Sequence, residues 1–203
     1  MPNETSTLNA FVFHGTGGNP EGNWFPWLKE RLETSGIKTV VPALPTPENQ
    51  SVENWLDAVS RYLPDMGENT HLIGHSSGAN FILHLLERLR TPVKYAVFVG
   101  TIMQPTGLED IDSLNETFIN HTFDWTKLRR SAARFKIFHS DNDPYTPLPH
   151  AERLSEGLGV PIHLIPGKGH LNAEWGCLSF DLLADDILKP AEQKPRAFGA
   201  SKL

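Results

Sequence analysis

The stretch Thr70-His71-Leu72-Ile73-Gly74-His75-Ser76-Ser77-Gly78 decides how this chain folds. Its first five residues, with Leu72 and Ile73 at their centre, predict a β-strand, and residues 79–89 carry apolar side chains at helical spacing. Between them lies the pattern Gly-x-Ser-x-Gly, in which small residues let a strand and a helix pack closely on either side of a sharp turn. We expect this turn to lift the Ser76 hydroxyl clear of the sheet, next to the unpaired N–H groups at the start of the helix.

Strand-like and helix-like segments alternate along the rest of the chain. Strands are expected at 8–13, 37–41, 70–74, 93–99, 134–139 and 160–165, and helices at 22–35, 52–63, 79–89, 124–132, 148–157 and 173–188. Six strands separated by helices predict an α/β fold with a mostly parallel six-stranded sheet. The stretch 101–122 has no clear period and is interpreted as a loop insertion with some local helix.

Composition limits the class of protein. Of the 203 residues, 39% are aliphatic or aromatic, which is enough for one domain with a sizeable core. We expect a single domain over residues 1–188 and a loose tail over 189–203, where there is almost nothing to bury. The net charge of -6, without a basic run, argues against nucleic acid as a partner. A single cysteine, Cys177, excludes an intramolecular disulfide and a multi-cysteine zinc site.

Three loops that follow predicted strands carry residues suited to acyl transfer. Ligands of such sheets bind beyond the carboxyl ends of the strands. Ser76 follows the third strand, a loop with Asp141 and Asp143 follows the fifth, and His170 follows the sixth. The chain order serine, aspartate, histidine is the order expected of an α/β-hydrolase triad. On position alone, either aspartate could be the acid, because acid loops vary among triads.

A glycine-rich loop, His14-Gly15-Thr16-Gly17-Gly18, follows the first strand. We expect the backbone N–H groups of Thr16 and Ser77 to form an oxyanion hole, in which loss of one donor typically costs about 3 kcal/mol of transition-state stabilisation. A phosphate-binding loop is the alternative, but this loop lacks the third glycine of Gly-x-Gly-x-x-Gly and the Lys-Ser/Thr of a P-loop. The spacing of Asp141-Asn142-Asp143 does not fit an EF-hand, so neither a metal site nor a cofactor is expected.

These motifs resemble those of the compact serine hydrolases of the YdeN and retinoblastoma-binding-protein type, a small branch of the α/β-hydrolase superfamily. The resemblance covers nearly all of 8–188, and it implies a minimal three-layer α/β-hydrolase fold without a cap domain. It also implies a triad of Ser76, His170 and Asp143, with Asp143 rather than Asp141 as the acid. The motifs that carry it are His14-Gly15, Trp24-Phe25-Pro26-Trp27-Leu28, Gly74-His75-Ser76-Ser77-Gly78, Asp143-Pro144-Tyr145-Thr146-Pro147 and Gly169-His170.

The resulting hypothesis is a serine hydrolase that cleaves small carboxylic esters, or related acyl compounds, through an acyl-enzyme on Ser76. Two alternatives stay open: an aminopeptidase or amidase with the same triad, and a non-catalytic protein-binding scaffold on the hydrolase fold. Trp24 and Phe25 are candidates for substrate contact near the oxyanion loop, with core packing as the alternative. The oligomeric state is left open.

The two ends of the chain suggest where the protein works. No apolar run approaches the roughly 20 residues needed to span a bilayer, and the polar N-terminus is unlike a signal peptide, so a cytoplasmic protein without a membrane partner is expected. The last three residues are Ser201-Lys202-Leu203, a tripeptide that directs proteins to the peroxisome. In a eukaryotic host we therefore expect a peroxisomal import receptor as a partner.

Overall fold

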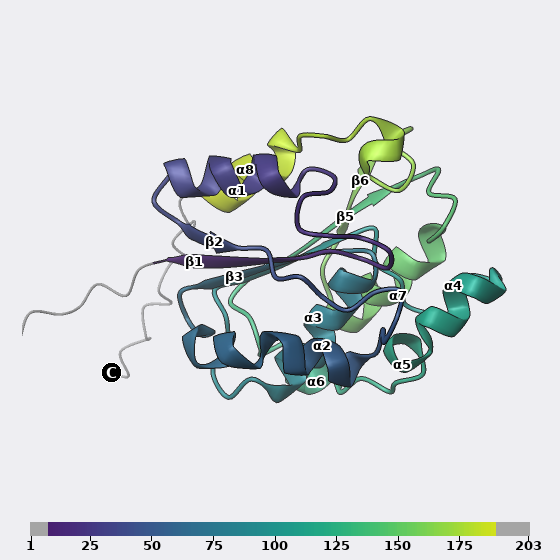
Figure 1. Ribbon diagram of the computed structural model, residues 1–203, viewed down its shortest axis with the longest axis horizontal. Coiled ribbons are helices and arrows are strands. Elements are labelled where there is room, and N and C mark those ends of the chain that lie inside the picture. Colours follow the sequence, from purple (N-terminus) through teal and green to yellow (C-terminus); the bar gives the residue numbers. More distant parts are fainter. Residues whose placement is uncertain (1–7, 190–203) are drawn as a thin grey trace, which may run out of the picture.

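The computed structural model describes residues 8–189 and shows a parallel sheet between two layers of helices (Figure 1). All five strand pairs are parallel, in the order β2-β1-β3-β4-β5-β6. Every residue of the two central strands, β3 and β4, is buried, as expected when both faces of a parallel sheet are covered. The predicted α/β fold is thus confirmed. The strands are β1 (Asn9–Phe13), β2 (Lys38–Val40), β3 (Thr70–His75), β4 (Tyr95–Val99), β5 (Phe135–Ser140) and β6 (Ile162–Ile165).

The helices divide between the two faces of the sheet (Figure 1). Helices α1 (Phe25–Thr34) and α8 (Asp181–Leu188) cover one face, and α2 (Val52–Val59), α3 (Ser77–Arg88), α6 (Trp125–Leu128) and α7 (Leu148–Leu158) lie on the other. Side-chain caps define two of these starts: Ser51 accepts from Asn54 N at 3.1 Å, and Asp124 accepts from Lys127 N at 3.0 Å.

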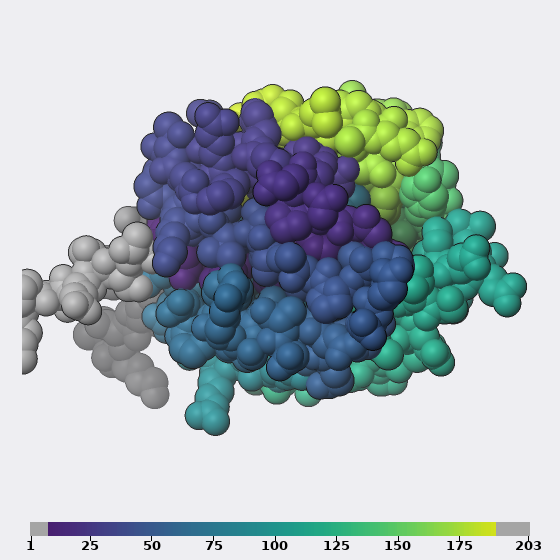
Figure 2. Space-filling view, viewed as in Figure 1, coloured from purple at the N-terminus to yellow at the C-terminus, as the bar shows by residue number. Residues whose placement is uncertain are grey.

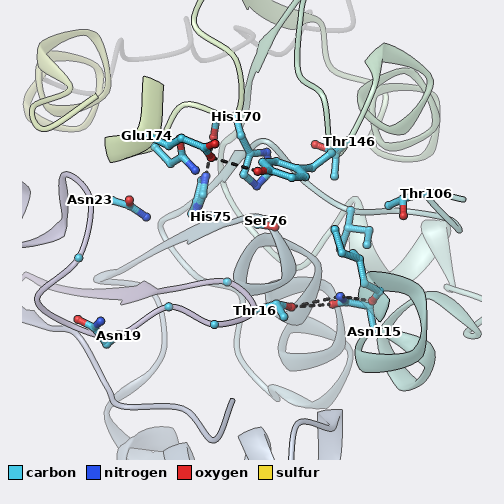
Figure 3. Close-up of a pocket in the computed structure, with 18 residues that line it drawn as sticks. Thr16, Asn19, Asn23, His75, Ser76, Thr106, Asn115, Thr146, His170 and Glu174 are labelled. Carbon is cyan, nitrogen blue, oxygen red and sulfur yellow. Dashed lines mark hydrogen bonds between the residues drawn. The ribbon is translucent and has the colours of Figure 1, made fainter. Parts of the chain in front are cut away.

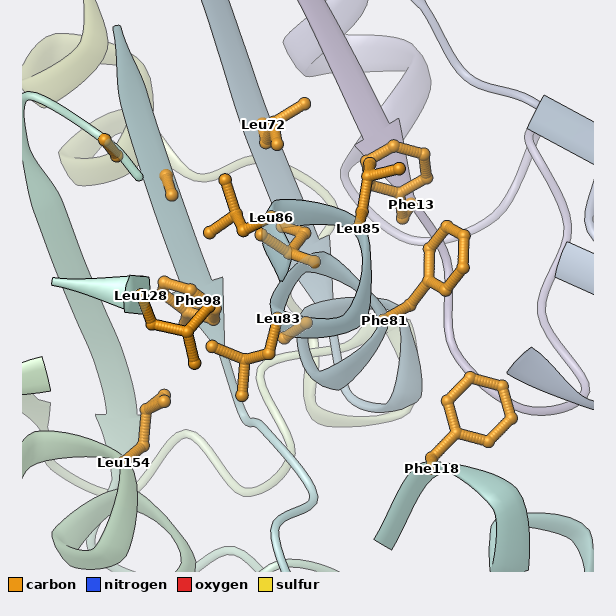
Figure 4. Packing of buried hydrophobic residues seen from close by; sticks show 14 of the residues in the cluster. Phe13, Leu72, Phe81, Leu83, Leu85, Leu86, Phe98, Phe118, Leu128 and Leu154 are labelled. Carbon is orange, nitrogen blue, oxygen red and sulfur yellow. The ribbon is translucent and has the colours of Figure 1, made fainter. Parts of the chain in front are cut away.

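Alternate residues of the strands fill two separate hydrophobic clusters. Phe11 and Phe13 point toward α2 and α3, whereas Ala10 and Val12 point toward α1 and α8. Figure 4 shows the first cluster, in which Phe13 and Leu72 from the sheet meet Phe81, Leu85 and Leu86 of α3. Helix α3, which is buried from Ser77 through Leu86, therefore lies in the centre of this layer, directly behind the Gly-x-Ser-x-Gly turn.

Three predicted helices differ from the structure. The helix expected over 124–132 is a single turn, α6, which ends at Leu128. The segment 173–188 is not one helix: a 3-10 turn, η2 (Ala173–Trp175), ends at Gly176 with φ 73°, and α8 begins only at Asp181. The left-handed backbone at Gly176 is incompatible with a continuing right-handed helix. The predicted helix over 52–63 is α-helical only to Val59 and continues as the 3-10 helix η1 (Ser60–Asp65), which contains Pro64.

The stretch between β4 and β5 forms the expected insertion. It holds the short helices α4 (Glu109–Leu114) and α5 (Glu116–Ile119) and projects at one edge of the molecule, shown in teal in Figure 2. Within residues 8–189, no helix is both long and apolar enough to cross a bilayer. The predicted tail beyond residue 189, with its C-terminal tripeptide, lies outside the described residues, so the location that rests on it stays a prediction.

Candidate active site

Ser76 occupies a strained turn between β3 and α3. Its backbone has φ 56° and ψ -120°, a conformation that residues with a side chain rarely adopt. The glycines on either side are required by close packing: a β-carbon on Gly74 would lie 2.4 Å from the carbonyl oxygen of Gly78, and one on Gly78 would lie 2.3 Å from that of Phe13. The Ser76 N–H donates to Val99 O at 2.9 Å, which fixes the turn against β4.

His170 and Asp143 form a buried pair. The distance from His170 Nδ1 to Asp143 Oδ2 is 2.8 Å, and the two residues are only 6% and 5% exposed. Burial alone would raise the pKa of Asp143, but hydrogen bonds from His170, Thr146 and Tyr145 outweigh it and hold this pKa below its ordinary value. A carboxylate can only accept, so His170 Nδ1 carries the hydrogen, and in the neutral ring the lone pair is on Nε2.

Asp141, the alternative acid, lies elsewhere. Its side chain is on the surface, where Oδ1 accepts from Gly167 N at 2.8 Å. The structure therefore brings Asp143, and not Asp141, to His170.

Ser76 and His170 both border one pocket with a volume of about 390 Å³ (Figure 3). Ser76 Oγ does not form a hydrogen bond with His170 in this structure, although both side chains reach the same space. Such contacts are often long before a substrate binds and shorten in the complex. The predicted nucleophile and base therefore border the same pocket. The hydrogen bond between His170 and Asp143 is formed in this structure, and the one between Ser76 and His170 is not.

Thr16 borders the pocket, and Ser77 is buried directly behind Ser76, with its hydroxyl in contact with Thr16. Thr16 is in the loop after β1, and Ser77 is the first residue of α3, where N–H groups have no partner within the helix. Within residues 8–189, no group accepts a hydrogen bond from the Thr16 N–H. Their two side-chain hydroxyls are hydrogen-bonded to each other at 2.8 Å, which ties the loop to the helix start.

A buried asparagine, which the sequence did not indicate, holds this pair of residues together. Asn115, at the junction of α4 and α5, accepts from Ser77 Oγ at 2.5 Å. It also donates through Nδ2 to Thr16 Oγ1 at 3.1 Å (Figure 3). Gln50 Nε2 donates to the same Thr16 hydroxyl at 2.8 Å. Asn115 lies in the stretch without a clear period, so no sequence signal pointed to it.

His75 and Trp24 hold the backbone of the histidine loop. His75 Nε2 donates to His170 O at 2.8 Å, and the rings of His75 and His170 lie 4.7 Å apart. Burial, helped by the neighbouring His170, lowers the pKa of His75 to about 3, so its ring is neutral near pH 7. Trp24 Nε1 donates to Leu171 O at 2.9 Å, where Leu171 has φ 53°. In the Gly-x-Ser-x-Gly pattern the position of His75 is variable, so the motif gave no sign of this contact.

The expected substrate contacts of Trp24 and Phe25 are wrong. Both rings are fully buried in the cluster under α1 and α8, where Trp24 packs against Phe25 at 4.7 Å and against Phe180 at 5.8 Å. Neither residue borders the pocket, and the neighbouring Asn23 does. Core packing, the alternative interpretation, is what the structure shows.

The pocket has two chemically different sides. Thr106 and Asn115 lie on one side of Ser76, and Asn19, Asn23 and Glu174 lie on the other (Figure 3). The first side is built by the insertion, which also contributes Ile102 and Ile111 to the lining; the second is polar. Within the described chain, no group of three or more histidine, cysteine, aspartate or glutamate side chains is placed to hold a metal ion.

Comparison with known proteins finds relatives along nearly the whole chain. A family model described as serine hydrolase matches residues 10–186. The hydrolase YdeN of Bacillus subtilis is 28% identical over 179 residues, which cover 88% of this chain and 94% of YdeN. The crystal structure of the ydeN gene product matches with a TM-score of 0.83 and covers 89% of this chain and 97% of its own.

Two more distant proteins share parts of this likeness. Serine hydrolase RBBP9 of Rattus norvegicus is 25% identical over 168 residues, which cover 81% of this chain and 88% of the rat protein. Est1E of Butyrivibrio proteoclasticus, solved with bound ferulic acid, matches with a TM-score of 0.65 at 15% identity and covers 93% of both chains. At this identity, the likeness to Est1E concerns the fold alone.

Proposed function

This chain belongs to the serine hydrolase family, and we propose that it hydrolyses small carboxylic esters through an acyl-enzyme on Ser76. One observation carries the proposal: a serine on a strained turn and a histidine hydrogen-bonded to a buried carboxylate border the same pocket. Strained backbone persists only where its surroundings enforce it, and it is concentrated at functional sites.

In the proposed reaction, Ser76 Oγ attacks the ester carbonyl carbon while His170 Nε2 takes the serine proton. The carbonyl oxygen becomes an oxyanion and accepts hydrogen bonds from the N–H groups of Thr16 and Ser77. The bond from carbon to the alcohol oxygen then breaks, and His170 gives its proton to the leaving alcohol. Water repeats the sequence on the acyl-enzyme, which releases the acid and returns the proton to Ser76.

Asp143 has a supporting role in this scheme. Its lowered pKa keeps it ionised at neutral pH, so it holds the Nδ1–H tautomer of His170 and stabilises the imidazolium that forms during proton transfer. The hydrogen bonds from Thr146 and Tyr145 fix the carboxylate, which in turn fixes the plane of the histidine ring.

The proposal is tested by steady-state kinetics with p-nitrophenyl acetate. Ser76→Ala is expected to lower kcat by a factor on the order of 10³ or more while leaving the circular dichroism spectrum unchanged. Ser113→Ala, which changes an exposed serine of α4, serves as the matched control and is expected to retain activity. Hydrolysis that survives Ser76→Ala would rule out the mechanism, and faster cleavage of aminoacyl p-nitroanilides than of esters would favour an amidase.

A further inference from the structure

The polar side of the pocket is lined by three asparagines and a glutamate, which we call the amide arm: Asn19, Asn23, Asn172 and Glu174. Asn19 and Asn23 come from the loop after β1, and the other two from the loop after β6. In each asparagine, the side-chain oxygen already accepts a backbone N–H. The donors are Glu21 N to Asn19 at 2.9 Å, Ala173 N to Asn23 at 3.0 Å, and Trp175 N to Asn172 at 3.3 Å.

These contacts decide which atom of each side-chain amide can form a hydrogen bond with a ligand in the pocket. Because the oxygens are engaged by backbone, the Nδ2 groups remain as donors, and within residues 8–189 no group accepts from them. In Figure 3 the amide nitrogen of Asn23 is directed toward the space beside Ser76. The arm therefore offers three amide donors to whatever occupies the pocket.

Glu174 adds the opposite character. Its carboxylate accepts from the Tyr145 hydroxyl at 3.1 Å and keeps further lone pairs for a ligand. A ligand carboxylate would meet the charge of Glu174. A ligand ammonium could pair with Glu174, but it cannot accept from the three amide N–H groups and would leave them without a partner. A hydroxyl group suits both, since it accepts from an amide N–H and donates to a carboxylate.

We propose that the amide arm binds the alcohol part of the ester, and that this part is a polyol or a sugar carrying several hydroxyls. The inference rests on the proposed function. His170 must protonate the leaving oxygen, so the alcohol lies next to His170, and Asn172 and Glu174 follow two and four residues later in the same loop. The acyl group then lies toward Ile102 and Ile111, whose apolar side chains suit a short aliphatic chain.

The arm is preformed. The bond from Ala173 N to Asn23 Oδ1 links its two loops directly, and Trp24 Nε1 anchors the second loop at Leu171. Asn23 and Leu171 both have left-handed backbone, with φ 52° and 53°, which the surrounding contacts must hold in place. A site that is already ordered loses less entropy when a ligand binds.

A matched pair of substrates tests the proposal: cyclohexyl acetate and the monoacetate of inositol, which share the ring and the acyl group and differ only in hydroxyls. The expected result for the wild-type protein is a kcat/KM for the inositol ester at least about tenfold above that for cyclohexyl acetate, as two or more hydrogen bonds to a ligand would give. A ratio of one or less would overturn the proposal. A preference for 4-aminocyclohexyl acetate over the inositol ester would overturn it too.

Asparagine-to-aspartate variants locate the effect. Asn23→Asp and Asn172→Asp keep the Oδ1 that accepts the backbone N–H but replace the Nδ2 donor with an acceptor. Each is expected to lower the ratio of the two kcat/KM values about fivefold, and using a ratio cancels the effect of the new charge on His170. Asn120→Asp, an exposed asparagine that does not line this pocket, adds the same charge and should leave the ratio unchanged. Unchanged ratios in both arm variants would contradict the proposal.

A binding measurement separates this inference from the proposed function. In the Ser76→Ala protein, inositol is expected to cause saturable NMR shifts for the side-chain amides of the arm, and cyclohexanol is expected to cause much smaller ones. This outcome with no esterase activity in the wild-type protein would refute the proposed reaction alone. Esterase activity with equal or larger shifts from cyclohexanol would refute the polyol inference alone.

Discussion

His75→Phe is the perturbation whose outcome follows most directly from the packing around His170. The substitution keeps an aromatic ring in a position that is 4% exposed but removes the N–H that donates to His170 O at 2.8 Å. A buried carbonyl left without its donor typically costs about 1–3 kcal/mol, so the free energy of unfolding should fall by that amount. Because the carbonyl belongs to His170 itself, the imidazole of this proposed general base should also move relative to Ser76.

A displacement near 1 Å between reacting groups can lower a rate on the order of a hundredfold. We therefore expect His75→Phe to lower kcat for p-nitrophenyl acetate about 10- to 100-fold with a smaller change in KM. His75→Gln, which offers an N–H at a similar reach, should recover most of the loss. Urea unfolding and steady-state kinetics on the same preparations give both numbers.

His84→Phe is the matched control. His84 is also buried, and its Nε2 donates to a backbone carbonyl, that of Phe118, at 3.1 Å, but it does not border the pocket. It should lose similar stability and keep its kcat. Equal kcat for His75→Phe and the wild-type protein, with the expected loss of stability in both variants, would show that His75 does no more than support the fold.

Three further predictions follow from the same geometry. Asp143→Asn should lower kcat by a factor on the order of 10³–10⁴, whereas Asp141→Asn should change it little; the reverse result would show that the acid has been misassigned. Asn115→Leu removes the acceptor of Ser77 and the donor to Thr16, so kcat should fall about 10- to 100-fold. A wild-type kcat in this variant would mean that Thr16 and Ser77, the proposed oxyanion-hole residues, are held in place without Asn115. Burial lowers the pKa of His71 to about 4, so below pH 6.5 the unfolded state binds more protons than the folded state. Up to about 3 kcal/mol of the free energy of unfolding should therefore be lost between pH 6.5 and 4. His71→Leu should make the urea midpoint depend less on pH, and an unchanged pH dependence would contradict this.

The sheet and the three site loops were predictable because they depend on local patterns. Apolar runs such as 95–99 and the glycines of the turn reflect constraints that act within a few residues. These are burial on both faces of the sheet and the lack of space for a β-carbon at Gly74 and Gly78. Parallel strands bring their carboxyl ends to one edge, which predicted that the loops with Ser76, Asp143 and His170 would meet. The choice of Asp143 over Asp141 came from the family resemblance.

The supporting contacts were not predictable because they join residues far apart in the sequence. Asn115 reaches Thr16 across 99 residues from a stretch with no periodic pattern, and His75 reaches the backbone of His170 across 95. The error at Trp24 and Phe25 has the same origin. An aromatic pair is as suitable for a pocket wall as for a core, and only packing against the distant helix α8 decides between the two.

The most direct test of the central claim is covalent labelling with a fluorophosphonate, which reacts with an activated serine. Mass spectrometry of the labelled wild-type protein should place one adduct on the peptide that contains Ser76, at a rate that falls sharply in His170→Ala and to nothing in Ser76→Ala. A protein that stays unlabelled, or an adduct on any other residue, would mean that these side chains do not form a working triad and that the fold serves as a scaffold.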